Sequence, residues 1–171
     1  HAGVEADNGL SEADLREAAR NGCTRLSTGL ETGSQRIADA MKKGTQQDTV
    51  SAFLHGASAA GISCRCTMIL GYPSETADDV HMSARFLEQH RGVIERVSLN
   101  RLVVITGTSL HRWLKHKPET FRGFRIVQEE PAVAQVEHRH DTAGSAEYRK
   151  AVMRLLTVVH KINARELSPH A

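Results

Sequence analysis

The stretch that decides the fold is "RLSTGLETGSQR", residues 25–36. It predicts a strand over residues 24–30, which brings one carboxylate, Glu31, to its carboxyl end just before a short turn around Gly33. A strand that ends on an acid and then turns into a helix is the layout of a ligand site in parallel α/β proteins. The same layout also occurs at an ordinary strand–loop–helix joint. On this stretch alone, both interpretations of Glu31 stay open.

Working outward, two more strands are predicted over residues 63–71 and 97–105. Helical patterns with their own start and stop residues separate the strands, beginning with a Ser11 cap that has Asp14 three residues on. Crossovers of this length connect parallel strands. The sequence therefore predicts the α/β class, with about three parallel strands flanked by helices. The predicted helices cover residues 11–22, 34–44, 48–61, 76–92 and 109–116.

The chain divides into three segments. Residues 1–10 are polar and begin at His1, which indicates an irregular tag remnant or the cut edge of a longer protein. Residues 11–117 hold the predicted strands and helices. Residues 118–171 form a C-terminal extension, in which an alternating stretch with Pro131 predicts irregular chain or edge strands. A long closing helix is predicted over residues 145–167.

The composition argues against several function classes. The 171 residues are 40% hydrophobic with a mean hydropathy of -0.37, and no apolar run approaches the roughly 20 residues of a membrane span. A net charge of +2 and an aromatic content of 4% argue against a nucleic-acid or membrane partner. The three cysteines are an odd number without a signal peptide, which predicts reduced thiols in a cytoplasmic protein.

Three segments together resemble the radical SAM superfamily, in particular its cobalamin-associated Fe–S oxidoreductases and the methylthiotransferase and coproporphyrinogen-oxidase-like relatives. They are "GLETGSQRIADAMKKGT" (29–45), "AAGISCRCTMILGYPSETADD" (59–79) and "LNRLVVITGTSLHRW" (99–113). The resemblance implies a parallel (β/α) partial barrel that binds S-adenosylmethionine beside a [4Fe–4S] cluster. The predicted strands then correspond to the fourth, fifth and sixth strands of that barrel, and the first three are missing.

The resemblance also assigns cofactor-binding residues. Glu31 falls where the family places a polar residue near the cofactor ribose, and Lys43 where a basic residue meets the methionyl carboxylate. Without the resemblance, Glu31 equally suits a cap of the following helix, and Lys43 a solvated lysine in the last turn of that helix.

The segment "MILGYPSET" (68–76) resembles the motif that follows the fifth strand. Ile69 and Leu70 would offer an apolar edge to adenine, and Gly71 would let the backbone approach the ligand. Glu75 is expected to cap the next helix. Each of these residues also suits a simple strand and turn.

The cluster motif CxxxCxxC is absent from the sequence, whose cysteines are Cys23, Cys64 and Cys66. The interpretation is therefore the C-terminal part of the catalytic barrel of a radical SAM Fe–S oxidoreductase, inactive alone, with no metal ligands and no assigned catalytic residue. Its expected partner is the missing N-terminal barrel half, and cobalamin use is left open. The alternative is a cluster-free α/β binding or oligomerisation module that keeps the fold without the chemistry.

Two other features have open interpretations. His138 and His140 would share one face of a strand and could hold zinc or nickel, although an exposed polar edge fits them better. Cys64 and Cys66 would likewise share a face, as a metal pair or, more simply, as packing. An open half barrel also exposes a strand edge. That edge predicts a homodimer, or cover by the chain's own amino- or carboxyl-terminal segment.

Overall fold

The structure is a computed structural model that describes residues 2–5 and 9–167. Its main element is a parallel sheet with the strand order β1-β2-β3-β4. The strands are β1 (Ala2–Glu5), β2 (Arg25–Glu31), β3 (Ser63–Leu70) and β4 (Ile94–Arg101). The predicted α/β class is thereby confirmed, with four parallel strands rather than about three.

The amino-terminal residues differ from the irregular chain expected over residues 1–10. Ala2–Glu5 is a strand that pairs in parallel with β2, Ala2 opposite Leu26 and Glu5 opposite Gly29. Polar composition does not prevent such pairing, because backbone groups alone make the ladder and an unpaired edge of β2 would leave them unsatisfied. Ala2–Glu5 thus covers the edge of β2, and β1 becomes the strand at this end of the sheet.

The strand predicted over residues 97–105 is also corrected. β4 begins at Ile94, and the chain leaves the sheet after Arg101. Leu102 donates its N–H to the Leu70 carbonyl at 2.8 Å, and the short strand β5 (Val104–Ile105) then joins a different sheet. A continuous apolar run does not reveal such a change of sheet.

Among the α-helices of the described residues, all except α3 begin at a side-chain cap. Ser11 and Asp14 form a capping box at α1, and Thr76 and Asp79 form another at α4. The elements are α1 (Glu12–Arg20), α2 (Gln35–Ala40), α3 (Gln47–Ala59), α4 (Ala77–Gln89), α5 (Ser109–His116) and α6 (Ala146–Asn163). None of these helices, which include every helix in the described ranges, has the length and apolarity of a membrane span.

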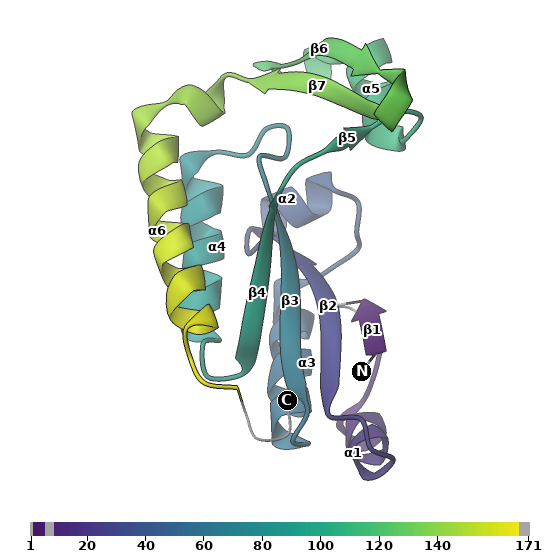
Figure 1. Ribbon diagram of the computed structural model, residues 1–171, viewed down its shortest axis with the longest axis vertical. Helices are drawn as coiled ribbons and strands as arrows, with labels where there is room; N and C mark the ends of the chain where they lie inside the picture. Colours follow the sequence, from purple (N-terminus) through teal and green to yellow (C-terminus); the bar gives the residue numbers. More distant parts are fainter. Residues whose placement is uncertain (1, 6–8, 168–171) are drawn as a thin grey trace.

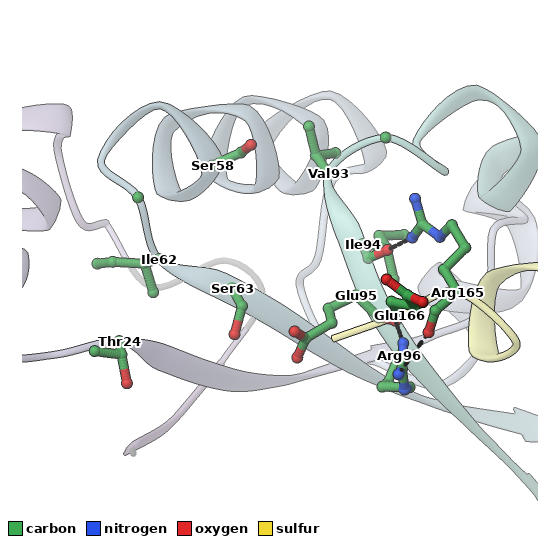
Figure 2. Close-up of a pocket in the computed structure, with 12 residues that line it drawn as sticks. Thr24, Ser58, Ile62, Ser63, Val93, Ile94, Glu95, Arg96, Arg165 and Glu166 are labelled. Atoms are coloured by element: carbon green, nitrogen blue, oxygen red, sulfur yellow. Dashed lines mark hydrogen bonds between the residues drawn. The ribbon is translucent and has the colours of Figure 1, made fainter. Parts of the chain in front are cut away.

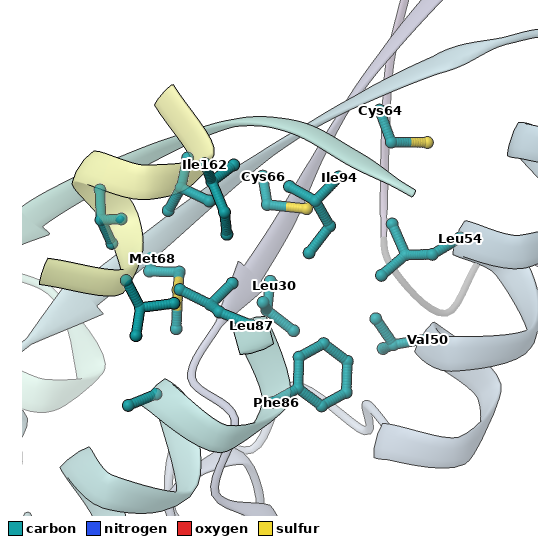
Figure 3. Packing of buried hydrophobic residues seen from close by; sticks show 14 of the residues in the cluster. Leu30, Val50, Leu54, Cys64, Cys66, Met68, Phe86, Leu87, Ile94 and Ile162 are labelled. Carbon is teal, nitrogen blue, oxygen red and sulfur yellow. The ribbon is translucent and has the colours of Figure 1, made fainter. Parts of the chain in front are cut away.

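The core lies between one face of the sheet and the helices (Figure 3). Alternate residues of the strands point into it, among them Leu30 of β2, Cys66 and Met68 of β3, and Val97 of β4. The opposite face carries short polar side chains such as Thr67 and Ser98, which are exposed. The predicted packing role of Cys64 and Cys66 is confirmed, because both thiols are buried in this core.

A second, antiparallel sheet lies beyond the carboxyl ends of the parallel strands (Figure 1). Its order is β5-β7-β6, where β6 is Phe124–Glu130 and β7 is Gln135–His140. Pro131 lies in the turn between β6 and β7, which explains how the hairpin tolerates it. Short 3-10 turns complete the region at Pro118–Thr120, Pro131–Val133 and Thr142–Gly144.

The closing helix α6 packs beside α4 and β4 (Figure 1). It begins at Ala146 and ends at Asn163, earlier than the predicted residue 167. The Asn163 side chain accepts from the Val97 N–H and donates to the Val97 carbonyl, each at 2.8 Å. These groups lie on the outer edge of β4, so the carboxyl-terminal segment covers this edge of the sheet, while β1 is the strand at the other end.

Candidate functional site

A cavity of about 390 Å³ lies at the carboxyl end of β3, between the loop after α2 and helix α5. Its walls are mostly apolar, and lysines stand at its margin. The lining residues are Met41, Lys42, Lys43, Ile69, Tyr72, Leu102, Ser109, Leu110 and Trp113. Ligand sites of parallel α/β folds lie at this end of the strands.

Glu31 and Lys43, which the resemblance assigns to the ribose and to the methionyl carboxylate of one ligand, form an ion pair at this margin. Oε1 of Glu31 lies 3.3 Å from Nζ of Lys43. The Glu31 side chain is 14% exposed and that of Lys43 42% exposed, so the pair is accessible to a ligand from the lysine side. An ion pair at this degree of exposure contributes little to stability.

The local backbone aims the Glu31 carboxylate. The β2–β3 register shifts between Gly29 and Glu31, and Glu31 has a φ of 60°, in the left-handed region. Its carboxylate folds back over Gly29, where an added Cβ would lie 2.8 Å from Oε1. Of the two interpretations left open for Glu31, the cap of the following helix is wrong, because Ser34 caps α2 by accepting from the Ile37 N–H.

Lys43 does not belong to the last turn of α2, which ends at Ala40. Its neighbour Lys42 also has a left-handed backbone and places Nζ 4.2 Å from the centre of the Trp113 ring. The two lysines therefore point to different partners, one to a carboxylate and one to an aromatic face. Trp113 and Leu110 were not among the expected site residues, and the only hint in the sequence is that the single tryptophan lies in a short amphipathic helix.

The segment 69–71 borders the cavity only in part. Ile69 lines it, whereas Leu70 accepts the Leu102 N–H through its carbonyl and Gly71 turns the chain with a φ of 89°. Of the expected site residues, Lys43 and Ile69 therefore line one cavity, and Glu31 contacts it through its ion pair with Lys43. Leu70 and Gly71 do not line the cavity, and their backbone supports its wall.

Glu75 does not cap α4, which corrects the expectation for this residue. It is 1% exposed, and its Oε2 accepts from the Gly71 N–H at 2.7 Å and from the Tyr148 hydroxyl at 2.5 Å. Burial raises the pKa of the Glu75 carboxyl to about 7. The cap position belongs to Thr76, whose hydroxyl accepts from the Asp79 N–H.

The described residues do not form a metal centre. No group of three or more His, Cys, Asp or Glu side chains in the described ranges could hold an ion. Burial raises the pKa of both the Cys64 and Cys66 thiols to about 12, so they are poor thiolate ligands. These thiols do not fit a [4Fe–4S] cluster.

The His138 and His140 rings both lie against the Phe124 ring. The centroid distances to the Phe124 ring are 4.7 Å for His138 and 5.4 Å for His140. Both histidines share one face of β7, as expected for alternate strand residues.

A second cavity, of about 330 Å³, opens at the amino ends of the same strands (Figure 2). Glu95 lies there, with Oε2 3.4 Å from Arg65 Nε and 3.8 Å from Arg25 Nε. Arg96 and Arg165 are bound to backbone carbonyls, those of Glu95 and Ile94 respectively. Because these arginines are already bound to a carboxylate or to backbone carbonyls, we interpret this end of the sheet as stabilising the fold rather than binding a ligand.

Comparisons with known proteins identify the family and the fold. A family model described as the radical SAM superfamily matches residues 1–87. Among solved structures, the radical S-adenosylmethionine methyltransferase TsrM from Kitasatospora setae, with tryptophan substrate and a SAM analog bound, has a TM-score of 0.67 at 11% identity. The match covers 98% of this chain and 36% of that one.

Two further solved structures have a similar fold. TsrM with cobalamin and a [4Fe–4S] cluster bound has a TM-score of 0.65 at 12% identity, covering 98% of this chain and 36% of that one. The coproporphyrinogen III oxidase HemN from Escherichia coli, a radical SAM enzyme, has a TM-score of 0.57 at 14% identity, covering 91% and 31%. The chain thus spans about a third of the length of these proteins. No curated protein matches the sequence.

Proposed function

The chain belongs to the radical SAM superfamily, and from this membership we propose that it forms the C-terminal part of the catalytic barrel of an Fe–S oxidoreductase and supplies contacts to S-adenosylmethionine. The observation that carries the proposal is the Glu31–Lys43 ion pair at the margin of the cavity lined by Lys43 and Ile69. It joins an acceptor for hydroxyls, a cation for a carboxylate and an apolar wall at the end of the sheet where such folds bind ligands.

Each part of the cavity has a chemical role in this proposal. The Glu31 carboxylate accepts hydrogen bonds from the ribose hydroxyls, and the Lys43 ammonium binds the methionyl carboxylate. Ile69, Leu102 and Trp113 exclude water from the adenine ring. Before the ligand binds, the Glu31–Lys43 pair keeps both side chains near these positions, which reduces the ordering cost of binding.

The cluster has to be held by other residues. In this superfamily the bound cluster supplies the electron for reductive cleavage of S-adenosylmethionine. Because Cys64 and Cys66 are buried against the helices, we propose that its ligands come from a separate N-terminal barrel half, and that this chain alone is inactive. The outer edge of β1, at the end of the parallel sheet, is where further strands would pair.

The alternative is a cluster-free module for binding or oligomerisation. The burial of Cys64 and Cys66 is compatible with this alternative as well, and a homodimer through the outer edge of β1 is the assembly it predicts. Cobalamin is bound in one of the TsrM structures, and its use by this chain stays a prediction. The cytoplasmic localisation suggested by three free thiols is likewise a prediction.

A ligand titration followed by NMR tests the proposal. We expect millimolar S-adenosylmethionine to shift the amide signals of Ile69 and Gly71 and the indole signal of Trp113. Glu31→Ala weakens the response about tenfold, the magnitude of a lost charge-assisted hydrogen bond. Glu88→Ala is the control, because it also removes a carboxylate from an ion pair, with Arg154 at 2.9 Å, at a position away from the cavity.

Two outcomes contradict the proposal. Wild-type signals that do not respond remove the cofactor role from this chain and favour the cluster-free module. Shifts confined to Ser63 and Arg96 move the ligand to the cavity at the amino ends of the strands.

A further inference from the structure

A buried tyrosine of the C-terminal helix reaches the loop that follows β3. Tyr148 is 3% exposed, and its hydroxyl donates to Oε2 of Glu75. The same oxygen accepts the Gly71 N–H. One carboxylate oxygen therefore joins the first turn of α6 to the backbone of Gly71, far away in the sequence.

The backbone at Gly71 sets part of the cavity wall. Its φ of 89° lies in the left-handed region, which favours glycine in this loop between β3 and the turn at residues 73–74. Ile69, two residues before Gly71, and Tyr72, directly after it, both line the cavity. The Tyr72 hydroxyl in addition donates to the Ala40 carbonyl at 3.0 Å, at the end of α2. A shift of the Gly71 peptide would therefore move both of these wall residues.

Helix α6 holds Tyr148 in place from both ends. The Ser145 hydroxyl caps the helix by accepting from the Tyr148 N–H at 3.1 Å. At the other end, the Asn163 side chain makes its paired hydrogen bonds to Val97 of β4. Between them, Ala151 and Leu155 are buried in the main core. The position of the Tyr148 hydroxyl is therefore determined by the docking of the whole helix.

The contact is energetically significant because Glu75 is shielded from water. When a buried carboxyl loses one of its hydrogen-bond donors, the loss in folding free energy is larger than the net contribution of an exposed hydrogen bond. Among the described residues, Gly71 N–H and Tyr148 O–H are the hydrogen-bond donors to this carboxyl. Without the tyrosine hydroxyl, the Gly71 N–H alone would have to orient Glu75.

We propose that Tyr148 is a positioning residue of the cavity, which acts through Glu75 to hold the Gly71 turn and with it the wall formed by Ile69 and Tyr72. Ligand affinity then depends on a docked α6. The identity of the ligand, the adenosyl group, rests on the proposed function, whereas the control of the turn by α6 does not.

Hydrogen exchange in the 171-residue chain tests the control of the turn without any ligand. In Tyr148→Phe, which removes only the hydroxyl, we expect the Gly71 amide to exchange about tenfold faster. Thr157→Val is the matched control, since it removes another α6 hydroxyl, which donates to the Met153 carbonyl. Unchanged exchange at Gly71 overturns the proposal. An equal increase at the core amides of Cys66 and Val97 also overturns it, because that pattern means general destabilisation.

A second variant tests whether Tyr148 acts through Glu75. In a Glu75→Leu background, Tyr148→Phe should have no further effect on exchange at Gly71, and a further effect of similar size contradicts the proposed route. If the Glu75→Leu chain fails to fold, the comparison of Tyr148→Phe with the wild type still decides whether the Tyr148 hydroxyl controls exchange at Gly71.

The affinity for S-adenosylmethionine completes the test. We expect Tyr148→Phe to weaken the NMR response several-fold and Thr157→Val to leave it unchanged. Faster exchange at Gly71 with unaltered affinity overturns the role of the turn in ligand binding. A wild type that does not bind S-adenosylmethionine contradicts the proposed function instead, while the ligand-free exchange still decides the control of the turn.

Discussion

The carboxylate of Glu31 lies against Gly29, so close that a Cβ added to residue 29 would be only 2.8 Å from Oε1 of Glu31. The absence of a side chain at Gly29 therefore allows Glu31 to turn back toward Lys43. A substitution at Gly29 should therefore change the position of the Glu31 carboxylate without much effect on the stability of β2. Gly29 itself does not line the cavity.

Gly29→Ala is expected to displace the Glu31 carboxylate and weaken the response to S-adenosylmethionine by about threefold to tenfold. Stability should change by less than about 1 kcal/mol, because the crowded atom is the far end of a flexible side chain and β2 tolerates alanine. NMR titration and thermal unfolding measure the two effects. Gly92→Ala is the control, since a Cβ there meets no atom within 4 Å. Equal affinities of the two variants for S-adenosylmethionine would show that the position of the Glu31 carboxylate does not matter for binding.

Gly33→Ala is expected to act on stability instead. A Cβ at this position would lie 2.7 Å from Cα of Ser83 and 2.8 Å from Cβ of Phe86, both in α4. Because the backbone of α4 would have to move, we expect a loss of about 1–3 kcal/mol in the free energy of unfolding. Chemical denaturation against Gly92→Ala checks this, and a loss as small as that of the control contradicts the close approach of the loop to α4.

The Glu75 carboxyl predicts a specific pH dependence of stability. Burial, and secondarily the charge of Asp79, raises its pKa from 4.5 to about 7, against the opposing effects of the Tyr148 and Gly71 hydrogen bonds and of Arg36. The folded state therefore retains a proton that the unfolded chain has released. The stabilisation is complete below pH 4.5 and is lost as the pH rises to about 7.

Comparison with Glu75→Gln isolates this contribution. Over that pH range the wild type should lose about 3 kcal/mol more than the variant in the free energy of unfolding, an upper value set by the size of the pKa shift. Denaturant titrations at pH 4.5, 6 and 8 measure the difference. Parallel stability curves for the two proteins would mean that Glu75 ionises normally.

The cysteines should differ sharply in reactivity. Cys64 and Cys66 are buried, and their thiol pKa values of about 12 leave almost no thiolate at pH 8, whereas Cys23 is partly exposed. Iodoacetamide should label Cys23 at least about a hundredfold faster than the other two, as read by mass spectrometry. In denaturant all three should react alike. Rapid labelling of Cys64 or Cys66 in the folded chain would reopen a metal-binding role for this strand.

Local sequence signals correctly predicted several helix starts and the central strands of the parallel sheet. The caps at Ser11 and Thr76 depend on residues three positions apart, so a pattern search finds them without knowledge of the fold. The placement of β2 and β3 followed in the same way from apolar runs bounded by turns. Glu31 and Lys43 were singled out as site residues, but the sequence contained no sign that they bind each other.

The predictions were wrong where the structure of a residue depends on a partner far away in the sequence. Ala2–Glu5 is a strand only because β2 offers an unpaired edge. Glu75 looked like a helix cap because an acid before a helix usually is one. Its actual partner, Tyr148, lies on the last helix, and no rule of spacing connects the two.

The sequence by itself determined the α/β class, the helix starts and the strand that carries Glu31, since these depend on periodicity and on interactions within one turn or strand. Only the tertiary structure decided that Lys43 and Trp113 border one cavity, that Glu75 bridges Gly71 and Tyr148, and that Cys64 and Cys66 pack in the core. Such contacts form when separate elements pack together, and their partners are set by the geometry of that packing rather than by their order in the chain.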